Sequence, residues 1–288
     1  MKTLKNIEKT ELNRQFAIPA FSGGSGIFYI DDMIYIISDK SNVLSVFDAD
    51  TGQIIRKISL QMDGSLEENI MKKYKPDFEA FVPWGGRYYI FGSGSAKHRF
   101  DLVILDEHFL IVERSSIKHL YQAMMEMSGI GSEDFNIEGV ILTDESALFF
   151  NRGNGPNRKN GIISVKNWLT GAPEVTAFKN ITLPAIDSQE ASFSDAILHN
   201  GHICFLANAE DTRSVYDDGK VAGSAIGLMQ LDTLEVLDYH IIERDVKYEG
   251  ITMYKQLKEP DRTVFLLCDD NDFEHETLIS QLTVFWGK

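Results

Sequence analysis

Five acidic or hydroxyl-bearing residues stand at nearly equal intervals along the 288-residue chain. They are Ser25, Glu79, Glu138, Asp195 and Glu249, with spacings of 54, 59, 57 and 54 residues. Each of the last four lies where an apolar, small-residue segment begins a strand-like run: FEAFV, IEGVIL, SDAIL and YEGITM. Carboxylate and hydroxyl oxygens are the donors that hard cations prefer. These five residues are therefore the candidate metal ligands of the chain.

Carboxylates that converge on one point need a compensating charge. Two of them about 5 Å apart repel by roughly 3 kcal/mol at an effective dielectric constant near 20. A cation could neutralise them, and six to eight oxygen ligands in loose geometry describe Ca²⁺ better than Mg²⁺. Alternatively, some of the carboxyl groups keep a proton because their pKa is raised, and the site holds only water. We expect a central Ca²⁺, with the water-filled channel as the alternative.

Each candidate ligand begins a unit of about 57 residues that contains short strand-like runs separated by polar turns. Runs rich in β-branched and aromatic residues, bounded by Gly, Asn and Asp, are typical of strands. Helical patterns at 66–74 and 117–127 connect units. A repeat of fixed period predicts a repeat architecture, here an all-β five-bladed β-propeller rather than two β-sandwiches. Residues 1–288 would form one domain, with blades starting near residues 25, 79, 138, 195 and 249.

The last unit contains only three strand-like runs, whereas residues 3–13 precede the first unit and belong to none. The N-terminal segment would therefore supply the outer strand of the last blade, beside residues 277–285. This pairing closes the ring and leaves no open sheet edge. Because the innermost strand of each blade lines the central channel, the candidate ligands would meet at one rim.

The loops between the second and third runs of each unit should open at the same rim. In the first three units these loops are rich in basic residues and contain a single carboxylate. Clustered cations beside a metal predict a pocket for a small anion that carries phosphate or carboxylate, although solvated loops also collect charge. The candidate anion-binding residues are Lys40, Lys97, Arg99, Arg152 and Arg158, and the candidate catalytic base is Asp39.

The formal net charge of −15 argues against nucleic acid and anionic membranes as partners, because both attract clustered positive charge. No apolar run reaches the roughly 18–20 residues that a transmembrane helix needs, and the opening residues lack the apolar core of a signal peptide. We expect a cytoplasmic monomer.

The repeat resembles the calcium-activated nucleotidases (apyrases), five-bladed propellers whose axial calcium is bound by serine and glutamate residues at the start of the inner strands. Residues 247–251 (KYEGI) are similar to that family's last-blade motif, residues 193–195 (FSD) resemble its fourth-blade Phe-Ser-Ser, and residues 38–40 (SDK) lie where it has an acidic-basic loop. In two respects the sequence departs from the family: Asp195 replaces a hydroxyl, and the loop GSGSAKHRF lacks a tryptophan. The Glu-Gly strand start also resembles the phytase-esterase-like propellers of bacteria.

This resemblance implies a calcium-dependent hydrolase of phosphoric esters or anhydrides. The metal would polarise a phosphoryl oxygen and orient water, while basic side chains of the loops neutralise the developing charge. The competing interpretation is a non-catalytic ligand-binding or scaffold propeller whose metal is structural. An esterase-like or lactonase-like activity at the same ion is a third, since a fold alone does not fix a function.

Overall fold

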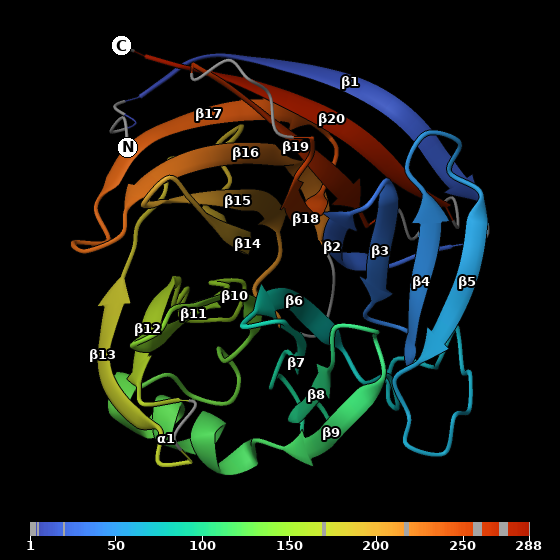
Figure 1. Cartoon of the computed structure of the whole chain (residues 1–288). Coiled ribbons are helices and arrows are strands. Elements are labelled where there is room, and N and C mark those ends of the chain that lie inside the picture. Colours follow the sequence, from blue (N-terminus) through green and yellow to red (C-terminus); the bar gives the residue numbers. More distant parts are fainter. Residues whose placement is uncertain are drawn as a thin grey trace.

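The computed structural model describes residues 4, 6–19, 21–168, 171–215, 219–255, 261–270 and 276–287. The described residues form five four-stranded antiparallel sheets, which are arranged around one axis (Figure 1). The five-bladed propeller predicted from the repeat is confirmed. Within these described ranges, no helix is long and apolar enough to span a membrane.

The strands of each blade follow one another from the channel outward. Blade 1 contains β2 (Gly24–Ile30), β3 (Met33–Ser38), β4 (Val43–Asp48) and β5 (Ile54–Ser59). Blade 2 contains β6 (Phe78–Trp84), β7 (Arg87–Gly92), β8 (Asp101–Leu105) and β9 (Ile111–Ser116). Blade 3 contains β10 (Ile137–Leu142), β11 (Ser146–Asn151), β12 (Gly161–Lys166) and β13 (Glu174–Asn180). Blade 4 contains β14 (Ala191–His199), β15 (His202–Asp211), β16 (Lys220–Gln230) and β17 (Val236–Arg244).

The fifth blade joins the two ends of the chain, as predicted. Its inner strands are β18 (Tyr248–Met253), β19 (Arg262–Asp269) and β20 (Glu276–Trp286), and its outer strand is β1 (Ile7–Pro19). β1 pairs antiparallel with β20 from Ile7 opposite Trp286 to Pro19 opposite Glu276. Both ends of the chain lie at the same corner of the ring (Figure 1). The closing strand extends beyond residue 13, because β20 offers a pairing edge along its whole length.

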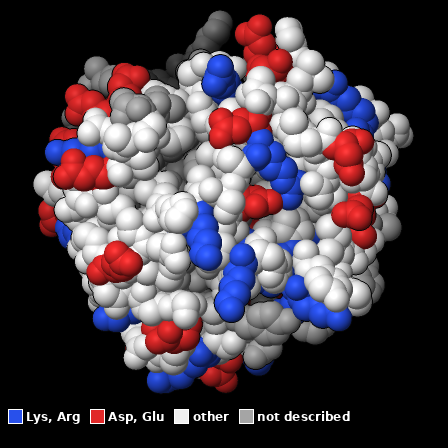
Figure 2. Space-filling view, turned by 90° about the horizontal axis from the view of Figure 1, so that it is seen from below, with Lys and Arg blue, Asp and Glu red and all other residues white. Residues whose placement is uncertain are grey.

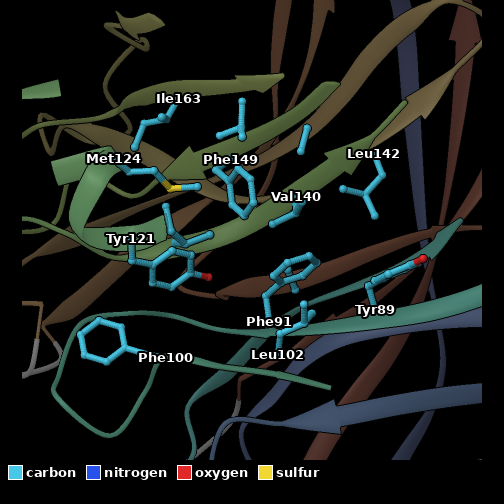
Figure 3. Close-up of a cluster of buried hydrophobic side chains, with 14 of the residues drawn as sticks. Tyr89, Phe91, Phe100, Leu102, Tyr121, Met124, Val140, Leu142, Phe149 and Ile163 are labelled. Carbon is cyan, nitrogen blue, oxygen red and sulfur yellow. The ribbon is translucent and has the colours of Figure 1, made fainter. Parts of the chain in front are cut away.

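Aromatic side chains fill the space between neighbouring blades. Figure 3 shows the cluster between blades 2 and 3, where the ring of Phe91 meets that of Phe149 edge to face at 5.6 Å. The single helix of the described residues, α1 (Lys118–Ser128), adds Tyr121 and Met124 to this cluster. The hydroxyl of Tyr121 donates to the carbonyl of Gly92 at 2.8 Å, which satisfies the only polar group of that side chain.

Residues 66–74 form an irregular loop that ends in a turn at 72–74, instead of the predicted helix. Their backbone bonds to the loop after β3: the N–H of Ile70 donates to the carbonyl of Lys40 at 2.8 Å, and the N–H of Asn42 donates to the carbonyl of Glu67 at 3.1 Å. Tertiary hydrogen bonds thus replace helical ones. As a result, the segment that leads into blade 2 lies against the loop of blade 1 at the channel mouth.

Candidate functional site

The same backbone irregularity occurs near the start of all five inner strands. In each, the pairing register slips by one residue, which marks a β-bulge with one extra residue on the inner strand. A bulge redirects the side chain of the extra residue. The bulged residues are Ser25, Glu79, Glu138, Ser194 and Glu249.

In blade 4 the bulge falls at Ser194, one residue before the Asp195 chosen from the sequence. The hydroxyl of Ser194 donates to the carbonyl of Tyr248 at 2.9 Å, and the hydroxyl of Ser25 donates to the carbonyl of Phe78 at 2.5 Å. Each serine therefore links its blade to the residue just before the glutamate of the next blade. Asp195 instead lines a different part of the channel, so the structure separates it from the three glutamates.

A cavity of about 270 Å³ occupies the channel mouth beside the bulges. Glu79, Glu138 and Glu249 line it, and Ser25 and Ser194 do not. The loops between second and third strands converge on it, as the sequence indicated. These loops contribute Asp39, Lys40, Arg99, Arg152, Asn154, Ser214 and Asp270 to the wall.

The charge of this cavity is buried. On the outer face drawn in Figure 2, by contrast, Lys and Arg side chains are interspersed with Asp and Glu over the surface. Charges taken out of water are costly unless each is paired. The pairing inside the cavity therefore decides what the site can bind.

Arg152 is the central cation of the mouth. Its guanidinium lies 3.1 Å from Glu138, 3.0 Å from Glu210 and 3.4 Å from Glu249, and the side chain is only 5% exposed. Lys247 extends the network, with its Nζ 2.7 Å from Glu249 and 3.2 Å from Glu210. These two buried cations therefore offset much of the repulsion between carboxylates that we predicted from the sequence.

A second ion-pair group lies on the side of blades 1 and 2. Lys75 pairs with Asp39 and lies 2.7 Å from Asp77, whose other oxygen lies 2.7 Å from Arg99. One carboxylate oxygen each from Asp39, Asp77 and Glu79 lie within 4.8 Å of one another. Three carboxyl groups at this spacing can hold a hard cation.

Glu79 differs from the other glutamates of the mouth. It is 8% exposed, and within the described part of the chain no cation or hydrogen-bond donor pairs with its carboxyl group. Burial raises the pKa of Glu79 well above its ordinary value, and the nearby Glu138 and Asp77 raise it further. Lys75 acts on Glu79 electrostatically without pairing with it, so an ionised Glu79 would be stabilised by a further positive charge at the mouth.

Two further oxygens in the wall are buried without a hydrogen-bond partner among the described residues: Oδ1 of Asp39 and Oδ1 of Asn154. Unsatisfied buried acceptors are uncommon and call for an explanation. Both are the kind of hard oxygen donor that calcium binds. Both residues line the same cavity as Glu79.

The predicted anion-binding residues divide into three groups. Lys40 lines the cavity and is half-buried, whereas the guanidinium groups of Arg99 and Arg152 are held by carboxylates. Lys97 is exposed and Arg158 lies 3.4 Å from Glu190, and neither lines the cavity.

Sequence reasoning missed several residues of the mouth. These are Lys72, Lys75, Asp77, Asn136, Glu210 and Lys247. A signal was present, because Asp77, Asn136 and Lys247 each precede a bulged glutamate by two residues. A polar residue at that position would point toward the same rim as the glutamate.

The fold has structural relatives of very different sequence. Myxococcus xanthus glutaminyl cyclase is 10% identical, with a TM-score of 0.54, over 96% of this chain and 97% of that one. Kuenenia stuttgartiensis hydrazine synthase is 10% identical, with a TM-score of 0.40, over 88% of this chain; the matched part spans 58% of that chain. A comparison with curated proteins gives no significant match. The model of the family described as "Family of unknown function (DUF6929)" matches residues 20–284, and the chain belongs to this family.

Proposed function

We propose that the channel mouth binds one Ca²⁺ and, beside it, a small phosphate-bearing anion. The observation that carries this proposal is the fivefold bulge, which puts three glutamates at one rim and leaves Glu79 buried without a partner in the described residues. With Ser194 in the fourth position, the bulged residues are serine or glutamate throughout. This removes one of the two departures from the apyrase pattern.

The charge balance of the mouth supports a bound cation. Among the described residues, the carboxyl groups there are those of Asp39, Asp77, Glu79, Glu138, Glu210, Glu249 and Asp270. The cations buried among them are Lys75, Arg99, Arg152 and Lys247. Even with Lys40 and Lys72 at the cavity wall, the carboxyl groups outnumber the cations. A bound cation would offset the excess negative charge.

Glu79 and the unpartnered Oδ1 atom of Asn154 are the residues we assign to the metal, and Asp39 is left as the candidate base. Bound calcium would supply a Lewis acid for a phosphoryl oxygen. Lys40 and Lys72, which line the cavity, would hold the remaining anion charge together with the metal. Burial raises the pKa of Asp39 to about 6, against the opposing effect of Lys75. A carboxylate near this pKa suits a general base at neutral pH, which fits hydrolysis of a phosphoric ester or anhydride.

Calcium binding is tested by calorimetric titration and by melting curves with calcium and with chelator. Saturation at a hundred times the dissociation constant should add about 2.7 kcal/mol to the free energy of unfolding. Glu79→Gln should weaken calcium binding at least tenfold, and should melt above the wild type in chelator because a buried unpaired carboxyl group is gone. Glu235→Gln, on the exposed β16–β17 turn, is the matched control and should behave as wild type. Phosphoric-ester and anhydride hydrolysis with calcium, in wild type and Asp39→Asn, tests the catalytic part.

A second candidate is a non-catalytic ligand-binding or scaffold propeller in which a built-in cation takes the place of the structural metal expected from the sequence. It is favoured by Arg152, which already bridges Glu138, Glu210 and Glu249 as a built-in cation. In that case calcium and chelator give the same melting curve, and no hydrolysis is seen. Arg152→Met would then be strongly destabilising, since removing one partner of a buried ion pair costs about 3–5 kcal/mol.

A further inference from the structure

A second cavity, of about 310 Å³, lies in the channel beyond the bulges, away from the charged mouth. Its wall is formed by the parts of the inner strands that follow the bulged residues. Phe28, Phe81, Trp84, Leu142 and Met253 are among the side chains that line it, and they make the wall largely apolar. Neither the proposed calcium site nor the anion pocket uses this lower cavity.

Asp195 places one carboxyl group in this apolar wall. Its Oδ1 accepts a hydrogen bond from the N–H of Ala196 at 2.7 Å, and its Oδ2 accepts one from the N–H of Ile251 at 2.8 Å. The side chain is 8% exposed, and within the described ranges no cation pairs with it. Each carboxylate oxygen can accept a second hydrogen bond. The carboxylate oxygens of Asp195 can therefore each accept one more hydrogen bond from a ligand in this apolar cavity.

The surroundings of Asp195 favour a positive partner. Burial raises the pKa of Asp195 well above its ordinary value, and the nearby carboxyl group of Glu138 raises it further. A cation beside the carboxyl group would stabilise its ionised form.

The rim around this end of the channel is acidic. At the described turns between first and second strands, and at the residues that directly follow them, are Asp31, Asp32, Asp144, Glu145 and Asp261, against Arg87, Lys255 and Arg262. Lys255 itself lies 3.7 Å from Asp32. A negative rim with low-dielectric walls raises the local concentration of cations.

We propose that the lower cavity binds a small organic cation, a primary ammonium group on an aromatic or branched apolar body. The ammonium group donates to Asp195, and the apolar body lies against Phe28, Phe81 and Trp84. Aromatic faces attract cations as well as apolar groups. The volume matches the lower end of ligand pockets, about 300 Å³. An anionic ligand would instead meet the carboxyl group of Asp195, and the described residues of this wall include no cation to hold it.

Calorimetric titration of the full chain with 2-phenylethylamine and with 2-phenylethanol tests the proposal. The two probes share the apolar body and differ in the charged group. The amine should bind at least about tenfold more tightly, since a charged hydrogen bond is made only by the amine. Asp195→Asn should remove this preference, whereas Glu79→Gln, which changes a carboxyl group at the charged mouth, should keep it.

Val82→Trp provides a variant that leaves Asp195 intact. Val82 is half-buried and lines the lower cavity, so the larger side chain should fill the site and abolish amine binding. Retention of binding in Val82→Trp would overturn the proposal even if Asp195→Asn fails to fold. Equal affinity of the wild type for amine and alcohol would also overturn it, as would no detectable binding of the amine at millimolar concentration.

Discussion

Asp269, the last residue of β19, shows how one buried carboxyl group can shape the pH dependence of stability. It is 3% exposed, and its Oδ1 accepts a hydrogen bond from the N–H of Leu278 at 2.6 Å. Burial raises its pKa to about 7. Between about pH 4 and pH 7 the folded chain holds this proton more tightly than the unfolded chain. The free energy of unfolding therefore falls as the pH rises through this range.

Asp269→Asn should reduce that slope and raise the free energy of unfolding at pH 8 by up to about 4 kcal/mol. The amide oxygen can still accept the hydrogen bond from Leu278, so packing is retained. Urea unfolding at pH 5 and pH 8 measures both effects, with the exposed Asp232→Asn as control. If Asp269→Asn keeps the wild-type slope, the carboxyl group of Asp269 is ionised at both pH values, and its pKa in the folded chain is not raised.

At the level of single residues, the repeat predicted where the glutamates lie but not what neutralises them. Glu79, Glu138 and Glu249 begin strands at a countable interval, which is local information. The pairing of Arg152 with Glu210 and Glu249 brings together residues from three blades, which no local pattern records. Arg152 therefore resembled a free anion-binding residue in the sequence.

The bulges are elements with a structural role of their own, because the serine bulges connect blades. The hydroxyls of Ser25 and Ser194 are buried and donate to carbonyls of the next blade. Ser25→Ala and Ser194→Ala should each lower the free energy of unfolding by about 1–3 kcal/mol, because a buried carbonyl loses its donor. Ser45, buried in β4 with no partner in the described residues, is the matched control.

Ser45→Ala should be neutral or slightly stabilising in the same denaturant titration, since its hydroxyl has no hydrogen bond to lose. Equal destabilisation of all three variants would mean that the effect comes from packing and that the serine hydroxyls do not hold the blades together.

Strand positions followed from composition and turn residues, but the bulge position did not. A bulge adds one residue without changing residue types, so Ser194 and Asp195 were equally good choices in the sequence. The segment 66–74 had a helical pattern, yet it forms an irregular loop with hydrogen bonds to residues 40 and 42. Contacts between distant parts of the chain therefore determine both the position of the bulge and the conformation of residues 66–74.

At the scale of the whole molecule, ring closure was readable from the sequence because it is a matter of counting. The fifth unit has one strand too few, and one segment at the N-terminus is unassigned. Only the pairing of this segment with the fifth unit leaves no open sheet edge. The structure adds a detail that makes closure testable. β1 and β20 end side by side: Ile7 pairs with Trp286, and the N–H of Gly287 donates to the carbonyl of Asn6 at 2.9 Å.

This proximity predicts that the closing strand can be moved to the other end of the chain. A circular permutant that starts at residue 20 and continues from residue 288 directly into residues 1–19 would turn the β20–β1 pair into a hairpin, with residues 287–288 and 1–6 as its loop. All strand pairs are retained, so it should melt within a few degrees of the wild type. Deleting residues 1–19 without permutation should instead expose the edge of β20 and cause aggregation or a large fall in melting temperature. An unchanged melting curve for the deletion, or an unfolded permutant with the same strands present, would show that the ring is held by something other than the β1–β20 pair.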